Sequence, residues 1–162
     1  MSRPAISLGC AVLSVSAAHG DDRSGELLAA RATAAGHAVV RRERVADDVE
    51  QLRRVFSDCI ADPAIQVVLG SGGSGFVRRN AVPEAAAGLL EQEIKGFGRL
   101  LHQLSYAEVG SAIVHARALA GYANGTLIFC LPGAIGACAL AWDCIISAQL
   151  AMPDQQYRLQ QR

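Results

Sequence analysis

A glycine-rich run, Gly70–Gly75, is the segment of this sequence best suited to hold a ligand. Glycine permits positive φ and close approach, so the backbone N–H groups of such a run can donate hydrogen bonds to phosphate oxygens. The run follows a short β-branched segment, Ile65–Leu69, and so predicts a loop at the carboxyl end of a strand. It is neither a P-loop, since no Gly-Lys-Ser/Thr follows, nor a dinucleotide fingerprint, since helix-opening Pro83 comes much later. A plain connecting loop fits the same spacing equally well.

Two acids, Asp47 and Asp48, lie between a second predicted strand, Ala38–Val45, and an amphipathic helix. An aspartate at such a position either caps the helix through its side-chain oxygen or offers a carboxylate to a cation, and capping does not exclude metal contact. The four histidines lack the H-x-x-x-H spacing of a helical zinc site. Metal ligation by histidine is therefore not expected.

The predicted elements place the glycine run and the acids at one edge of a sheet. Strands alternate with helices, which predicts a three-layer α/β/α sandwich with a mostly parallel, doubly wound sheet and a C-terminal β-hairpin. Ligands of such folds bind beyond the carboxyl ends of the strands. We expect strands at Ile6–Ser16, Ala38–Val45 and Ile65–Leu69, helices at Glu26–Ala35, Val49–Ile60, Glu84–Glu93, Phe97–Glu108 and Gly136–Leu150, hairpin arms at Ile113–Ala120 and Thr126–Leu131, and a frayed tail from Pro153.

The composition bounds the class of protein. With 162 residues, 51% of them hydrophobic and 19% charged, we expect one domain over residues 1–162 with its own core. The net charge of zero argues against nucleic acid or anionic membranes as partners, and no apolar stretch is long enough to cross a bilayer. Five cysteines without a C-x-x-C pair, and no signal peptide, predict buried thiols and a cytoplasmic location. So many apolar residues in a small chain predict a homo-oligomer.

The segment Gly72–Ala85 (GGSGFVRRNAVPEA) closely resembles a signature of the molybdopterin adenylyltransferase and molybdenum cofactor biosynthesis protein B family. That signature has GGTG, then Arg-Asp, then Pro-Glu-Ala. Further blocks resemble the family in the same order over nearly the whole chain: Ser14–Ser16, Asp22–Gly25, Val45–Asp48, Gly96–Gly98, Leu104–Ser105, Ala116–Arg117, Ala120–Gly121 and Leu131–Gly133. The family is related to the gephyrin N-terminal domain, and the resemblance points to a homo-trimer or homo-hexamer.

The resemblance implies a reaction in which molybdopterin and Mg²⁺-ATP give adenylyl-molybdopterin and pyrophosphate. It assigns a catalytic role to Asp47 and Asn80, with Asp47 also a ligand of Mg²⁺. The molybdopterin ligand and the ATP cosubstrate would be held by residues at the predicted strand ends. These are Ser14, Ser16, Ser71, Gly72, Gly73, Ser74, Gly75, Ser105, Pro132 and Gly133.

This sequence departs from the family pattern at two acids. Asn80 stands where the family has the aspartate of Arg-Asp, and Ala17 stands where a further aspartate follows the first strand. Asparagine offers a carbonyl oxygen but no charge, so both changes remove negative charge from the implied metal site. Two functions therefore stay open: molybdopterin binding with adenylyl transfer, and molybdopterin binding by a non-catalytic paralogue that stores or scaffolds the ligand.

Overall fold

A computed structural model describes residues 6–15, 21–72 and 81–161. Within these residues six strands form one sheet in the order β2-β1-β3-β6-β5-β4. The strands are β1 Gly9–Val15, β2 Ala38–Val45, β3 Val67–Ser71, β4 Gln92–Glu93, β5 Leu119–Ala123 and β6 Thr126–Leu131. The helices are α1 Arg23–Ala34, α2 Val49–Ala61, α3 Ala81–Ala87, α4 Lys95–Val109, α5 Ile135–Ala141, α6 Ser147–Ala151 and α7 Pro153–Gln160, with a 3₁₀ helix at Gly110–His115 and a π-helix at Trp142–Ile146.

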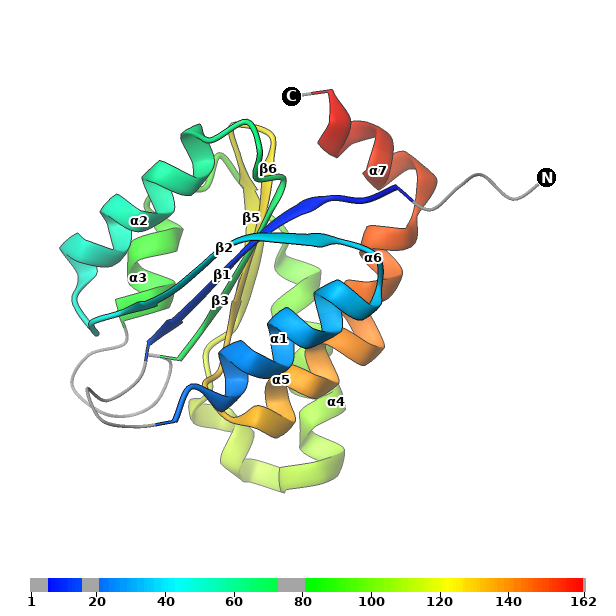
Figure 1. Cartoon of the computed structure of the whole chain (residues 1–162). Helices are drawn as coiled ribbons and strands as arrows, with labels where there is room; N and C mark the ends of the chain where they lie inside the picture. The colour runs from blue at the N-terminus through cyan, green and yellow to red at the C-terminus, as the bar shows by residue number, and fades with distance from the viewer. Residues whose placement is uncertain (1–5, 16–20, 73–80, 162) are drawn as a thin grey trace.

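The helices cover both faces of the sheet, which confirms the predicted α/β sandwich (Figure 1). Alternate residues of each central strand point to opposite faces, as the pleat requires. Cys10 and Val12 of β1 pack with α1, α4, α5 and α6. Ala11 and Leu13 pack instead with α2 and α3, where Phe56 is fully buried. Each large side chain that is fully buried contributes about 1.5–3 kcal/mol to stability.

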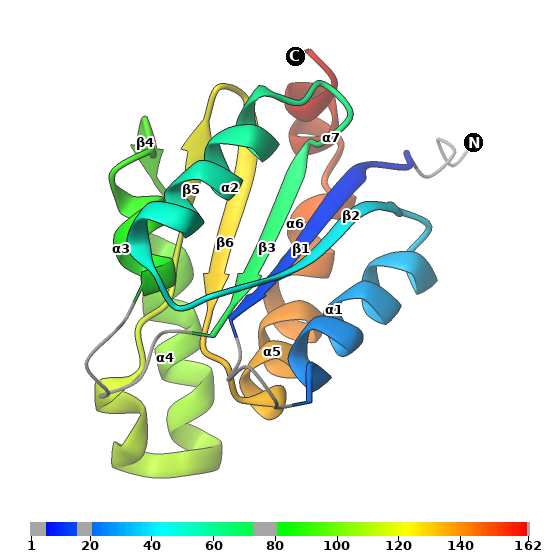
Figure 2. The ribbon, with the colours of Figure 1, turned by 60° about the vertical axis from the view of Figure 1, so that its left-hand side comes forward.

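The adjacent strands β2, β1, β3 and β6 are parallel, so their carboxyl ends meet at one edge. Figure 2 shows the arrowheads of β3 and β6 at the same end of the molecule, where α5 begins. The register pairs Ser14 with Ser71 and Ser71 with Leu131. We call the ends of these four strands, with the chain that directly follows them, the carboxyl edge.

The predicted hairpin differs from the structure in its first arm. Residues 110–115 form a 3₁₀ helix, and β5 begins only at Leu119. The turn lies at Asn124 and Gly125, whose φ values of 47° and 75° belong to the left-handed region that a two-residue hairpin turn requires. Helices α5, α6 and α7 follow this hairpin. The helix expected to reach Glu93 was also wrong, because α3 ends at Ala87 and Gln92–Glu93 pair with β5.

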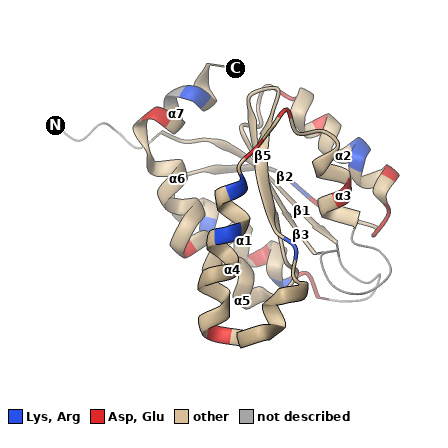
Figure 3. Cartoon of the chain, turned by 180° about the vertical axis from the view of Figure 1, so that it is seen from behind, with Lys and Arg blue, Asp and Glu red and all other residues tan. Residues whose placement is uncertain are grey.

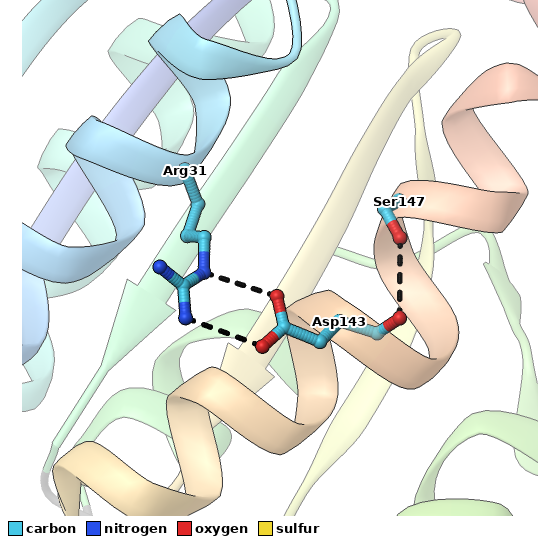
Figure 4. Close-up of polar contacts among 3 residues, drawn as sticks. All are labelled: Arg31, Asp143 and Ser147. Atoms are coloured by element: carbon cyan, nitrogen blue, oxygen red, sulfur yellow. Dashed lines mark hydrogen bonds and ion pairs between the residues drawn. The ribbon is translucent and has the colours of Figure 1, made fainter.

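The apolar C-terminal segment is helical throughout but changes its winding at the π-helix Trp142–Ile146. There Asp143 accepts two hydrogen bonds from the Arg31 guanidinium, at 3.0 and 3.2 Å, and so ties this segment to α1 (Figure 4). The Ser147 hydroxyl donates to the Asp143 carbonyl at 3.4 Å. Both charged side chains are about half exposed, so the pair orients the helices more than it stabilises them.

The tail expected to fray forms α7 instead. Leu159 is fully buried, the Tyr122 hydroxyl donates to Gln155 Oε1 at 2.6 Å, and the Arg158 guanidinium lies 3.7 Å from the centre of the Tyr122 ring. These contacts attach the polar tail to the sheet, a tertiary effect that its composition does not reveal.

Charged residues lie on the helices, on β2 and in the connecting segments, while β1, β3, β5 and β6 carry none (Figure 3). Four of the five cysteines are buried as predicted, but Cys144 is exposed. No single helix of the described ranges is long and apolar enough to cross a membrane; only α5–α6 taken together with α7, bent by 73°, meets that test by length and composition.

Candidate functional site

The carboxyl edge brings together several residues that the sequence predicted for one site. Ser14 and Ser71 lie on adjacent strands, and the backbone N–H of Gly72 donates to the carbonyl of Leu131 at 3.1 Å. Pro132 and Gly133 follow that carbonyl directly. The strand register thus places Ser14, Ser71, Gly72 and the turn after β6 side by side, as parallel pairing from the sequence suggested.

Close backbone contact requires glycine at position 72 and leaves little room for a side chain at position 133. Gly72 has φ of +96°, and a Cβ there would lie 2.4 Å from the carbonyl oxygen of Val15. A Cβ on Gly133 would lie 3.1 Å from the Cα of Gly72. Any side chain at Gly72 would therefore push the chain at the end of β3 away from Val15 at the end of β1.

Buried polar atoms without a partner distinguish the carboxyl edge. The hydroxyl of Ser14 and Oδ1 of Asp22 form no hydrogen bond with any described residue, although both atoms are inaccessible to solvent. An unsatisfied buried polar atom costs about 1–3 kcal/mol, so such atoms are rare unless a ligand pairs with them. They supply one hydroxyl and one carboxylate oxygen to a ligand at the strand ends.

Asp22 and Ser24 belong to a block that resembles the family, but the sequence analysis did not name them as site residues. The side chain of Asp22 is only 8% exposed, and its Oδ2 accepts a hydrogen bond from Arg42 of β2 at 3.1 Å. Its carboxylate folds back over the first turn of α1, where a Cβ on Gly25 would come within 2.5 Å of it. The hydroxyl of Ser24 lies 3.1 Å from that of Ser71. The signal available in the sequence was the Asp-x-Ser-Gly pattern at the start of a helix that follows a buried strand.

Asp47 also faces this edge. Its Oδ1 accepts a hydrogen bond from the backbone N–H of Ala81 at 3.3 Å, and Ala81 follows Asn80 in the chain. The neighbouring residue Asp48 caps α2, because its side chain accepts a hydrogen bond from the backbone N–H of Gln51 at 2.9 Å. Asp47 therefore does not cap α2, and its hydrogen bond goes to the first backbone N–H of α3.

The donors for a metal ion are few in the part of the chain that the structure describes. No group of three or more histidine, cysteine, aspartate or glutamate side chains is close enough there to hold an ion. Mg²⁺ often takes only one or two protein carboxylates and completes its shell with phosphate oxygens and water. Asp47 fits that pattern as a single ligand beside a nucleotide, and does not fit a metal bound by protein alone.

Ser105 and Pro132 line a cavity of about 270 Å³ between α4, the 3₁₀ helix and the start of α5. The Ser105 hydroxyl is buried and also has no partner among the described residues. One wall is fixed by His102, whose two ring nitrogens lie 2.7 Å from the carbonyl oxygens of Gly98 and Ala116. The predicted site residues thus fall into two adjoining groups, a polar strand-end group and this mostly apolar cavity.

Several predicted site residues lie outside the described ranges. These are Ser16, Gly73, Ser74, Gly75 and Asn80, together with the substituted position Ala17. Their roles stay predictions.

Comparison with known proteins gives a consistent result. A family model described as a probable molybdopterin binding domain matches residues 5–152. The chain is 42% identical over 142 residues to the molybdenum cofactor biosynthesis protein B of Escherichia coli K12, covering 86% of this chain and 84% of that protein. It is 38% identical over 146 residues to the protein of the same name from Bacillus subtilis, covering 88% and 85%.

Solved structures agree with these relatives. A crystal structure of a molybdenum cofactor biosynthesis protein B matches with a TM-score of 0.91 and 31% identity, over 99% of this chain and 100% of that one. A tungsten cofactor synthesizing protein from Pyrococcus furiosus matches with a TM-score of 0.79 and 30% identity, over 87% and 91%.

Proposed function

The chain belongs to the family of probable molybdopterin binding domains and is a molybdenum cofactor biosynthesis protein of the B type, and from this premise we propose that it binds molybdopterin at its carboxyl edge. The observation that supports this most directly is the set of buried, unpartnered oxygens on Ser14, Asp22 and Ser105. A ligand rich in N–H and hydroxyl donors would satisfy all three.

The two adjoining groups of residues suit the two ends of such a ligand. The cavity beside Ser105 and Pro132 suits a flat heterocycle, because its lining is mostly apolar. The glycine run from Gly72 suits the phosphate end, because its backbone N–H groups can approach oxygens closely. We assign Gly73, Ser74 and Gly75 to that phosphate end, with Ser16 and Ser71 beside it and Gly133 keeping the opposite turn clear.

The experiment that tests this proposal measures molybdopterin affinity directly. Gly73→Val should abolish binding because the added side chain occupies the space through which phosphate reaches the backbone. Gly88→Val is the matched control, since a Cβ at Gly88 meets no atom within 4 Å. Unchanged affinity in a Gly73→Val protein whose circular dichroism matches wild type would contradict the assignment.

We further propose that the bound molybdopterin is adenylylated by ATP, with its phosphate attacking the α-phosphorus and pyrophosphate leaving. Asp47 and Asn80 would hold Mg²⁺, and the bound ion would neutralise negative charge on the phosphates during transfer. The contact of Asp47 with Ala81, the residue after Asn80, supports this proposal. Asn80 supplies a carbonyl oxygen and no charge, so we expect slow transfer.

Incubation with molybdopterin, ATP and Mg²⁺, with detection of adenylylated product, tests the transfer step. Asn80→Asp should raise the rate while leaving molybdopterin affinity nearly unchanged, and Ala17→Asp combined with it should raise the rate further if both acids serve one metal. Molybdopterin binding without product in any of these proteins would favour the non-catalytic paralogue, for which the loss of acids at Ala17 and Asn80 is the specific observation.

We also propose a homo-trimer or homo-hexamer. Tyr106, Val109 and Val114 are 63%, 54% and 70% exposed, and they lie on neighbouring parts of α4 and the 3₁₀ helix. Such apolar side chains are commonly covered by another subunit. Sedimentation at micromolar concentration should give a mass of three or six times 17.0 kDa, and a species of 17.0 kDa alone would contradict the proposal.

A further inference from the structure

The cavity beside Ser105 has a lining that is almost entirely apolar. It is formed by Ser105, Glu108, Val109, Ala112, Ile113, Ala116, Pro132, Ala134, Gly136 and Ala137. Its volume of about 270 Å³ is close to the lower end of small-molecule sites, roughly 300–1,000 Å³. A single flat heterocycle fits such a space, whereas a whole nucleotide needs more room.

Two side chains in this lining can form strong hydrogen bonds, and both come from one face of α4. Ser105 and Glu108 are three residues apart, which places them one above the other on the helix. The Ser105 hydroxyl is buried and has no partner in the described part of the chain. Glu108 likewise makes no hydrogen bond or ion pair with any described residue.

Glu108 differs in this respect from three glutamates elsewhere on the surface, while Glu26 and Glu93, which also pair with no described residue, do not line the cavity. Glu84 pairs with Arg117 at 2.9 Å, Glu50 pairs with Arg53 at 2.8 Å, and Glu91 accepts from the backbone N–H of Asn124 at 2.8 Å. A carboxylate left without such a partner, at the mouth of an apolar cavity, is available to a ligand that offers N–H donors.

The chemistry of a carboxylate selects among flat heterocycles. Its two oxygens accept two parallel hydrogen bonds, so they match a ring edge with two adjacent N–H donors. The 2-amino-4-oxo pyrimidine edge of a pterin has this pattern, with the amino group beside the N3–H. The edges of adenine place an acceptor beside a donor, and lumazine replaces the amino group by a carbonyl that a carboxylate repels.

We propose that Glu108 determines the specificity of this site by accepting hydrogen bonds from the amino group and N3–H of the pterin ring, with Ser105 pairing with a further polar atom of the ring. This inference rests on the proposed function, since it assigns one end of the same ligand. It adds that the protein selects the aminated ring and rejects the dioxo ring.

The test compares the affinities of pterin and lumazine, measured by their own fluorescence, for wild type, Glu108→Gln and Glu50→Gln. Glu50→Gln is the matched control, because it removes the same charge from α2 on the other face of the sheet. Wild type and the control should prefer pterin by about tenfold or more, the value of a hydrogen bond to a charged group. Glu108→Gln should lose about tenfold in pterin affinity and most of this preference.

The outcomes separate this inference from the proposed function. If wild type binds molybdopterin and Glu108→Gln keeps both its affinity and the preference for pterin over lumazine, the role of Glu108 is wrong while the proposed function stands. If wild type binds molybdopterin but neither free ring, the same substitution is scored on molybdopterin affinity, and a loss absent from Glu50→Gln supports the inference. If molybdopterin itself does not bind wild type, the proposed function fails.

Discussion

The two ends of the parallel strands differ in whether their polar groups have hydrogen-bond partners within the protein. At the amino ends, the Gly9 N–H donates to Gln66 Oε1 at 2.6 Å, and Gln66 Nε2 donates to the Pro63 carbonyl at 3.0 Å. The Leu8 N–H donates to His37 Nδ1 at 3.2 Å. At the carboxyl edge and in its adjoining cavity, Ser14, Asp22 and Ser105 hold buried oxygens that pair with no described residue. The polar groups at the amino ends are thus paired within the protein, whereas those at the carboxyl edge remain available to a ligand.

The difference separates residues that hold the fold from residues that await a ligand. A satisfied buried polar network stabilises one structure, while an unsatisfied group lowers stability unless something binds to it. Proteins commonly accept such a loss at functional sites. We therefore expect substitutions at the amino ends to change stability, and substitutions of the unpartnered oxygens to change binding.

The largest effect should come from Gly9→Ala at the amino end of β1. A Cβ there would lie only 1.8 Å from the carbonyl oxygen of Ala64, so β1 or the turn before β3 must move. We expect a loss of about 3 kcal/mol or more in the free energy of unfolding, at the upper end of overpacking effects. Urea denaturation measures it, with Gly88→Ala as a control that meets no atom. Equal stability of the two variants would show that the amino end is not closed as described.

A smaller loss is expected for Gln66→Ala. This change removes the acceptor of the Gly9 N–H and the donor to the Pro63 carbonyl, which leaves both backbone groups without these partners. One such loss costs about 1–2 kcal/mol. The urea midpoint should fall accordingly while molybdopterin affinity stays unchanged, since Gln66 lies at the far end of the strands. A fall in affinity without a fall in stability would reverse the comparison between the two ends.

The sequence predicted the sheet better than it predicted the amino-end network. Apolar runs without charge identified β1, β3 and β6, because strands buried on both faces must be apolar along their whole length. The pairing of Gln66 with Gly9 joins residues 57 positions apart, and no local pattern reports it. The same holds for the tail, where Leu159 and Arg158 are fixed by contacts with distant parts of the chain.

At the carboxyl edge the sequence identified the turns but not every polar group. Gly72 and Pro132 follow buried strands and were predicted for that reason. Asp22 was not singled out, because its burial depends on Arg42 of β2 and on the space that Gly25 leaves above α1. Glu108 was also missed as a site residue, since an exposed acid on a helix resembles any solvated side chain until the cavity beside it is seen.

A pH-dependent effect of smaller size is expected from His37 at the amino end of β2. Burial lowers the pKa of His37 below its ordinary value of 6.5, and its Nδ1 must stay unprotonated to accept from the Leu8 N–H. Because the unfolded chain then binds the proton more readily, this contribution to stability is complete above pH 6.5 and is lost as the pH falls through the lowered pKa. Urea midpoints between pH 5 and pH 8 should show this loss for wild type, and His37→Gln should remove that part of the pH dependence.

The smallest change in stability is expected where the comparison is sharpest, at Ser14. Its hydroxyl is buried and pairs with no described residue, so Ser14→Ala removes an unsatisfied group and leaves none behind. The free energy of unfolding should change by about 0.5 kcal/mol at most, or rise slightly.

Thr126→Val is the counterpart at the amino end, because the Thr126 hydroxyl is fully buried and donates to the Ile65 carbonyl at 3.5 Å. That variant should lose about 1 kcal/mol and keep its affinity for molybdopterin. Ser14→Ala should instead lose up to about tenfold in affinity, the value of one neutral hydrogen bond to a ligand. If Ser14→Ala destabilises the protein as much as Thr126→Val and binds molybdopterin normally, then the Ser14 hydroxyl stabilises the fold, and the carboxyl edge does not differ from the amino end in the way we infer.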